Sequence, residues 1–169
     1  MKKVKPAGRV KDDVFFLISV SLKSNAGPAN LIYHILGGPE FMLKEPTSEL
    51  QYLTASNKGL RKSALHSLSS ILDIPMKDMA SLLNISYKTL SRKRDIDLLD
   101  PLESSLSIEL ASLSAKGISL FESIEKFNHW LKRENHSLGG QTPLALLNTP
   151  TGIKLVTRTI ERISEGIYS

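Results

Sequence analysis

A short segment near the middle of the chain gathers hydroxyl and basic side chains and contains no acid. Its members are Ser86, Tyr87, Lys88, Thr89, Arg92, Lys93 and Arg94. Bases and hydroxyls bond to the phosphate oxygens of a nucleic acid, and side chains early in a helix can reach base edges in the major groove. The segment therefore predicts contact with DNA.

The surrounding charge falls into two opposite blocks. Residues 57–94 carry eight bases against two acids, whereas residues 95–125 carry seven acids against one base, Lys116. A basic block bounded by an acidic one indicates a surface that binds a polyanion. Ordinary solvated helix faces would produce the same pattern, so charge alone leaves both interpretations open.

The same stretch fits a helix-turn-helix, and each position has a steric reason. Ala80 must be small where the second helix crosses the first, and Asn84 tolerates the left-handed turn usually occupied by glycine. Ile85 and Leu90 would fill the space between the helices, while Ser86 would cap the second. Plain packing of two helices would also give this pattern. The basic side chains favour contact with phosphates.

Helical periodicity extends over most of the chain and predicts a mainly α fold. The expected helices cover residues 60–73, 76–83, 86–94, 102–116, 119–132 and 151–166. Loops are expected at Gly117, at Gly139-Gly140 and around Pro143 and Pro150. We predict a helix-turn-helix domain over residues 57–116 and a small helical domain over residues 117–169.

The first 56 residues have no assignable chemistry. Residues 1–11 carry five bases and no acid, as a basic arm would. The apolar run Val14–Val20 fits a strand or a helix equally well, and residues 31–36 predict a short helix that stops at Gly37. We expect this extension to serve in dimerisation or packing.

Composition excludes several classes of protein. The 169 residues are 41% apolar and 23% charged, as in an ordinary globular protein, and they contain no cysteine. Disulfides, thiolate metal sites and cysteine nucleophiles are therefore excluded. The longest apolar run is far shorter than the roughly 20 residues that span a bilayer. We expect a cytoplasmic protein.

No arrangement of side chains predicts catalysis, a metal or a cofactor. The four histidines are scattered, and the segment Asp95–Asp100 lacks the glycine and the distal glutamate of a calcium loop, so N-capping explains it better. Glu161 and Glu165 lie one helical turn apart, but nothing nearby would separate their acidities. We therefore predict a protein that is not an enzyme.

A second pattern lies in the C-terminal third, and with the helix-turn-helix it carries a family resemblance. The motifs are Leu138-Gly-Gly-Gln-Thr-Pro-Leu144, Leu147-Asn-Thr-Pro-Thr-Gly152 and the terminal Gly166-Ile-Tyr-Ser169, preceded by Leu83-Asn-Ile-Ser-Tyr-Lys-Thr-Leu-Ser-Arg92. From Leu60 to Ser169 the chain resembles the Xre/MbcA/ParS antitoxins, whose toxins carry the RES domain. Two positions depart from that family, which usually has arginine where Gln141 stands and glycine where Asn84 stands.

The resemblance implies a type II antitoxin with two functions. Its C-terminal domain would bind a RES toxin, an enzyme that degrades NAD, and lay its extreme C-terminus over the active site. The antitoxin would also bind operator DNA, repress its own operon, and form homodimers and larger complexes around a toxin dimer. The expected toxin-binding residues are Leu138, Gly139, Gly140, Gln141, Thr142, Arg158, Arg162, Gly166, Ile167, Tyr168 and Ser169.

The residue types agree with an ordered loop followed by an amphipathic helix. Gly139 and Gly140 allow backbone conformations closed to other residues, and Thr142-Pro143 can open a helix. Along the last helix an apolar stripe is expected to face the core. It comprises Ile153, Val156, Ile160 and Ile163. Tyr168 could instead pack on its own domain, since chain ends often do no more than dock.

Two other functions fit the helix-turn-helix. The chain could be a one-component transcription regulator whose C-terminal part binds a small molecule. It could also be a scaffold protein whose helix-turn-helix no longer binds DNA, in which case DNA affinity would be absent even at low salt.

Overall fold

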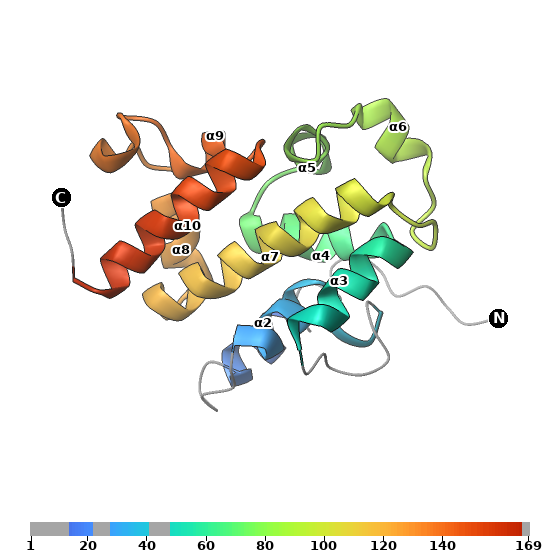
Figure 1. Ribbon diagram of the computed structural model, residues 1–169, viewed down its shortest axis with the longest axis horizontal. Helices are drawn as coiled ribbons and strands as arrows, with labels where there is room; N and C mark the ends of the chain where they lie inside the picture. The colour runs from blue at the N-terminus through green and yellow to red at the C-terminus, as the bar shows by residue number, and fades with distance from the viewer. Residues whose placement is uncertain (1–13, 22–27, 41–47, 167–169) are drawn as a thin grey trace.

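The computed structural model describes residues 14–21, 28–40 and 48–166 and is built of helices (Figure 1). Residues 14–21 are helical, and the elements that follow are α2 (Pro28–Ile35), the 3₁₀ helix η1 (Gly38–Glu40), α3 (Glu49–Lys58), α4 (Ser63–Leu72), α5 (Met76–Leu82), α6 (Tyr87–Arg92), α7 (Pro101–Phe121), α8 (Ile124–Leu131), the 3₁₀ helix η2 (His136–Leu138), α9 (Pro143–Leu146) and α10 (Pro150–Ser164). Within these ranges there is no strand, and the predicted mainly α class is confirmed.

Helix α7 runs through the centre of the molecule. It starts where Asp100 accepts a hydrogen bond from the Glu103 backbone while the Glu103 carboxylate accepts one from the Asp100 backbone, and Pro101 occupies the first helical position. Ser107 and Ser114 are buried, and each hydroxyl donates a hydrogen bond of 2.7 Å to the backbone carbonyl one helical turn earlier. Small, satisfied side chains of this kind let neighbouring helices approach α7 closely.

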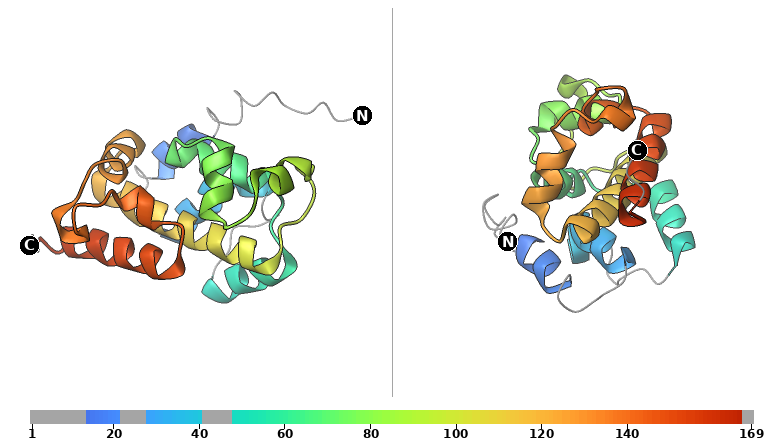
Figure 2. Two further views of the ribbon diagram at one scale, coloured as in Figure 1. Left: turned by 90° about the horizontal axis from the view of Figure 1, so that it is seen from above. Right: turned by 90° about the vertical axis from the view of Figure 1, so that its left-hand side faces the viewer.

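The other helices surround α7. In Figure 1 the helices α2 and α3 lie below it, α5 lies above it and α4 behind it, while α10 runs alongside its C-terminal half. Figure 2 shows the same arrangement from above and from one end. One continuous apolar core results, and it reaches from Val14 to Ile160.

The ambiguous run at Val14 is a helix. Val14 and Ile18 are buried, whereas Phe16 and Val20 point away from the core, which is the spacing of one helical face. The helix predicted over residues 31–36 is confirmed as α2, and the chain turns at Gly37 with a φ of 101°. The N-terminal elements thus contribute to the core around α7.

The loop predicted at Gly117 is wrong, and so is a helix starting at Ser119. Helix α7 continues to Phe121, and the turn comes at Glu122, whose φ is 54°. Gly117 is buried, and a β-carbon on it would overlap the ring of Phe127 in α8. The glycine is there because the next helix packs against it, which no local pattern in the sequence reveals.

None of the helices in the described ranges combines the length and apolarity needed to cross a membrane.

The contact between Gly117 and Phe127 gives a test of this packing. We expect Gly117→Ala to lower the free energy of unfolding by about 1 to 3 kcal/mol, because the added methyl displaces a fully buried ring. Urea denaturation would measure the change, with Ser119→Ala on the exposed side of the same helix as the control. Equal stability of the two variants would contradict the close approach of α7 and α8.

Candidate nucleic-acid interface and C-terminal binding surface

The turn between α5 and α6 has helix-turn-helix geometry. Asn84 adopts the left-handed conformation with a φ of 58°. The Ile85 backbone N–H then donates to the Ala80 carbonyl at 3.0 Å. Ala80 and Leu90 are buried at the crossing and Ile85 packs against them from the edge of the core. The predicted roles of these residues are confirmed.

The predicted cap of α6, the second or recognition helix of the motif, is also confirmed. The Ser86 hydroxyl accepts a hydrogen bond from the Thr89 backbone N–H at 3.0 Å and lies 2.8 Å from the Thr89 hydroxyl. Helix α6 is shorter than predicted, because the backbone turns to an extended conformation at Lys93. Both hydroxyls predicted to face DNA therefore also serve to hold the start of α6.

The long polar side chains of α6 project into solvent. The ring of Tyr87 is half exposed, and Lys88 and Arg92 are exposed. Neither base forms an ion pair with any residue that the structure describes. A phosphate can therefore approach them without first breaking an internal contact.

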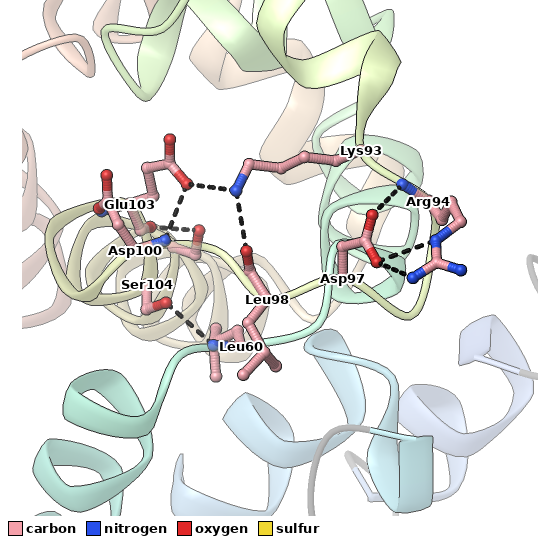
Figure 3. A network of polar contacts seen from close by, with 9 residues as sticks. Leu60, Lys93, Arg94, Asp97, Leu98, Asp100, Glu103 and Ser104 are labelled. Atoms are coloured by element: carbon pink, nitrogen blue, oxygen red, sulfur yellow. Dashed lines mark hydrogen bonds and ion pairs between the residues drawn. The ribbon is translucent and has the colours of Figure 1, made fainter.

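Lys93 and Arg94 are engaged within the protein (Figure 3). The Lys93 ammonium donates to the Leu98 carbonyl at 2.8 Å and lies 3.9 Å from the Glu103 carboxylate. The Arg94 guanidinium donates to Asp97 at 2.8 Å, and this contact lowers the pKa of the Asp97 carboxyl and raises that of the guanidinium. These two bases hold the loop after α6 in place.

A second set of polar contacts ties this loop to α4. The Lys62 ammonium donates to the Lys93 carbonyl at 2.7 Å and lies 3.6 Å from the Asp95 carboxylate. The His66 ring nitrogen lies 2.9 Å from the same carboxylate, and this hydrogen bond is the main cause of the lowered pKa of Asp95. The C-terminal end of the recognition helix is therefore fixed from two sides.

Glu103 is a structural residue that the sequence analysis did not single out. Its side chain is 7% exposed, and it joins the cap of α7 to the ammonium of Lys93. Next to it, the Ser104 hydroxyl accepts from the Leu60 backbone N–H at 2.9 Å (Figure 3). The spacing of Asp100 and Glu103 is the signature of a capping box and could have identified the pair.

The loop before α9 is closed by backbone hydrogen bonds. Asn135 donates its N–H to the Gln141 carbonyl at 3.1 Å, and its own carbonyl accepts from Leu138 and Gly140 at 3.0 Å. Gly139 and Gly140 have φ values of 67° and 80°, which only glycine adopts at low cost. Leu138 is buried beneath the loop, whereas the other predicted toxin-binding residues at its tip, Gly139, Gly140 and Gln141, are exposed.

The joint between α9 and α10 explains the second C-terminal motif. Thr142 caps α9 and Thr149 caps α10, where its hydroxyl accepts from the Gly152 backbone N–H at 3.0 Å. Gly152 lies directly against the Leu146 carbonyl, and a β-carbon there would overlap it. The helix opening predicted at Thr142-Pro143 is confirmed. Pro150, around which the sequence predicts a loop, is instead the first residue of α10. Much of this motif builds the joint itself.

Helix α10 separates into two faces as predicted. Ile153, Val156 and Ile160 are buried and Ile163 is half-buried. Arg158 and Arg162 are exposed on the other side, as is Gly166 after the end of the helix. The last three predicted residues lie outside the described ranges. They are Ile167, Tyr168 and Ser169.

The two candidate surfaces lie at opposite ends of the molecule. Figure 1 shows α6 at the upper right, and the C-terminal end of α10 and the loop before α9 at the left. The view from above in Figure 2 separates α6 from the C-terminal end in the same way. A ligand at either end would leave the other end open.

Comparison with known proteins assigns both parts of the chain. Residues 51–112 match the antitoxin Xre-like helix-turn-helix domain. Residues 116–166 match the antitoxin Xre/MbcA/ParS C-terminal toxin-binding domain. The chain belongs to the Xre/MbcA/ParS antitoxins. In this antitoxin α7 runs from the first matched domain into the second, so one helix belongs to both.

One relative extends the comparison to most of the chain. The antitoxin is 26% identical over 145 residues to the "Prs ADP-ribosylating antitoxin" of Sphingobium sp. (strain YBL2), an alignment that covers 79% of this chain and 91% of the relative.

The different roles of neighbouring bases can be tested by stability. We expect Lys93→Ala to lower the free energy of unfolding by about 1 to 3 kcal/mol, because it leaves the buried Glu103 carboxylate without its cation. Lys88→Ala should change it by less than about 0.5 kcal/mol, since that side chain is exposed. Thermal or urea denaturation of both variants would check this, and equal losses would contradict the assignment.

Proposed function

We propose that this antitoxin inhibits a RES-domain, NAD-degrading toxin with its C-terminal domain and binds operator DNA with α6 to repress its own operon. The observation that carries the proposal is the separation of the two surfaces on one continuous core. The antitoxin acts by stoichiometric binding, without catalysis and without a cofactor. It works in the cytoplasm, as a homodimer and within a larger complex with its toxin.

The exposed residues around the C-terminal end supply the toxin-binding surface. Gly139, Gly140 and Gln141 are exposed on a loop that backbone hydrogen bonds close, and Arg158 and Arg162 add positive charge on α10. A preformed loop loses little conformational entropy on binding, which favours a tight complex. The segment Ile167–Ser169 would follow from Gly166 into the active site of the toxin.

The Sphingobium relative carries the word "ADP-ribosylating" in its name, and ADP-ribosylation is a reaction that consumes NAD. Hydrolysis of NAD and transfer of its ADP-ribose to a protein both break the bond between nicotinamide and ribose. They differ in the acceptor, which is water in one reaction and a protein side chain in the other. Release of nicotinamide therefore reports on either activity, whichever acceptor the toxin uses.

The contribution of the C-terminal end to inhibition is tested with the protein encoded beside the antitoxin gene. The full chain should bind this protein and suppress its release of nicotinamide from NAD. A chain truncated after Gly166 should still bind, through the loop and α10, but should leave most of the nicotinamide release intact. Full suppression by the truncated chain would show that the last residues do not cover the active site.

Two reciprocal controls separate the surfaces. Lys88→Ala should bind and inhibit the toxin like the unaltered chain, and the truncated chain should bind operator DNA as the full chain does. If the full chain neither binds nor inhibits the neighbouring protein, the proposed partner is wrong.

The DNA-binding surface is tested with a duplex taken from the promoter of the operon. We expect Lys88→Ala and Arg92→Ala each to weaken binding and to reduce the slope of log affinity against log salt by about 1, because each removes one phosphate contact. Lys126→Ala on α8 removes the same charge at a distance from α6 and serves as the control. An equal loss in all three variants would indicate a general charge effect and contradict a specific surface on α6.

A further inference from the structure

In the part of the chain that the structure describes, the side chains of three residues link the C-terminal region to the helix-turn-helix by hydrogen bonds. The Asn128 amide donates to the Ile71 carbonyl at 2.8 Å, and Lys132 donates to the Asp73 carboxylate at 2.6 Å. Both of these reach the end of α4. The third link is different, because the Asn84 amide donates to the Asn148 carbonyl at 3.0 Å and so starts from the turn that precedes the recognition helix.

Asn84 is placed where a small displacement would alter the direction of α6. Its left-handed φ of 58° sets the angle between α5 and α6, and α6 begins three residues later at Tyr87. Glycine would adopt the same backbone conformation at lower cost, but it has no side chain to donate. The asparagine therefore adds a link to the turn without being needed for its shape.

The acceptor belongs to the most tightly built part of the C-terminal region. Asn148 lies between Leu147, which is fully buried, and Thr149, which caps α10. Gly152 rests on the Leu146 carbonyl one turn into α10. Because α9, the joint and α10 are fixed to one another, the Asn148 carbonyl moves when this unit moves.

We propose that Asn84 is a positioning residue that couples operator binding to toxin binding. A toxin held by the loop before α9 and by α10 shifts the joint that carries the Asn148 carbonyl, and the Asn84 amide passes this shift to the turn before α6. This inference rests on the proposed function. Coupling is reciprocal, so the operator changes the affinity for toxin by the same factor.

The strength of the link limits the size of the effect. An exposed neutral hydrogen bond can transmit no more than its own contribution, which corresponds to a change of about two- to ten-fold in an equilibrium constant. Operator affinity in the presence of saturating toxin should therefore differ from the affinity of the free antitoxin by a factor in this range.

The experiment compares this factor in the full chain and in Asn84→Gly. This substitution preserves the left-handed turn and leaves the links from Asn128 and Lys132 in place, so the fold should be retained. Fluorescence titration of the operator duplex, with and without the cognate toxin, gives two dissociation constants for each variant. We expect their ratio to fall close to one in Asn84→Gly.

Glu122→Gly is the matched control. Glu122 also has a left-handed φ, of 54°, but it lies at the end of α7 away from α6. This variant should keep the ratio of the unaltered chain.

Each other outcome has a definite meaning. If toxin leaves the operator affinity of the unaltered chain unchanged, the coupling is absent although both binding functions stand. If Asn84→Gly keeps the full ratio, the link through Asn148 does not carry it. If the unaltered chain binds neither toxin nor operator, the proposed function itself fails.

Discussion

The burial of α7 on nearly all of its sides is the constraint on which the other elements depend. Its small buried residues, Ser107, Ser114 and Gly117 among them, let helices from both halves of the chain pack against it. Glu103 in the first turn of α7 also forms an ion pair with Lys93, and this contact connects the core to the loop after the recognition helix. Both candidate surfaces are thus carried by one central helix.

The two charge blocks neutralise each other in part. Asp97 pairs with Arg94, Glu103 with Lys93, and Asp95 with Lys62 and His66. Because these bases pair within the protein, they are not free to contact DNA, although a count of charges alone would include them. The same contacts hold the C-terminal end of α6 in place. Within residues 57–94, the bases that stay exposed without an ion pair to any described residue are Lys58, Arg61, Lys77, Lys88 and Arg92. The acidic block therefore limits the proposed DNA-binding surface, because it pairs with the bases at the edge of that surface.

Local rules predicted the helix-turn-helix and the opening of α9, because Asn84, Ser86 and Thr142 act through their own backbone neighbourhood. They failed at Gly117, where a glycine is required because the Phe127 ring of the next helix packs against it. Local rules also did not predict the hydrogen-bond and ion-pair partners of Lys93. They left the run at Val14 open between strand and helix, since a short apolar run does not show a clear periodicity. Site residues that contact another molecule stay predictions, because a single chain does not contain their partners.

The central claim is that toxin and operator occupy opposite ends of one antitoxin. The most direct test adds toxin to a preformed complex of antitoxin and operator duplex and follows the mass of the DNA-bound particle while nicotinamide release is recorded. We predict a heavier particle that contains all three components and an inactive toxin. Release of the DNA by toxin, or of active toxin by the DNA, would contradict the separation of the two surfaces.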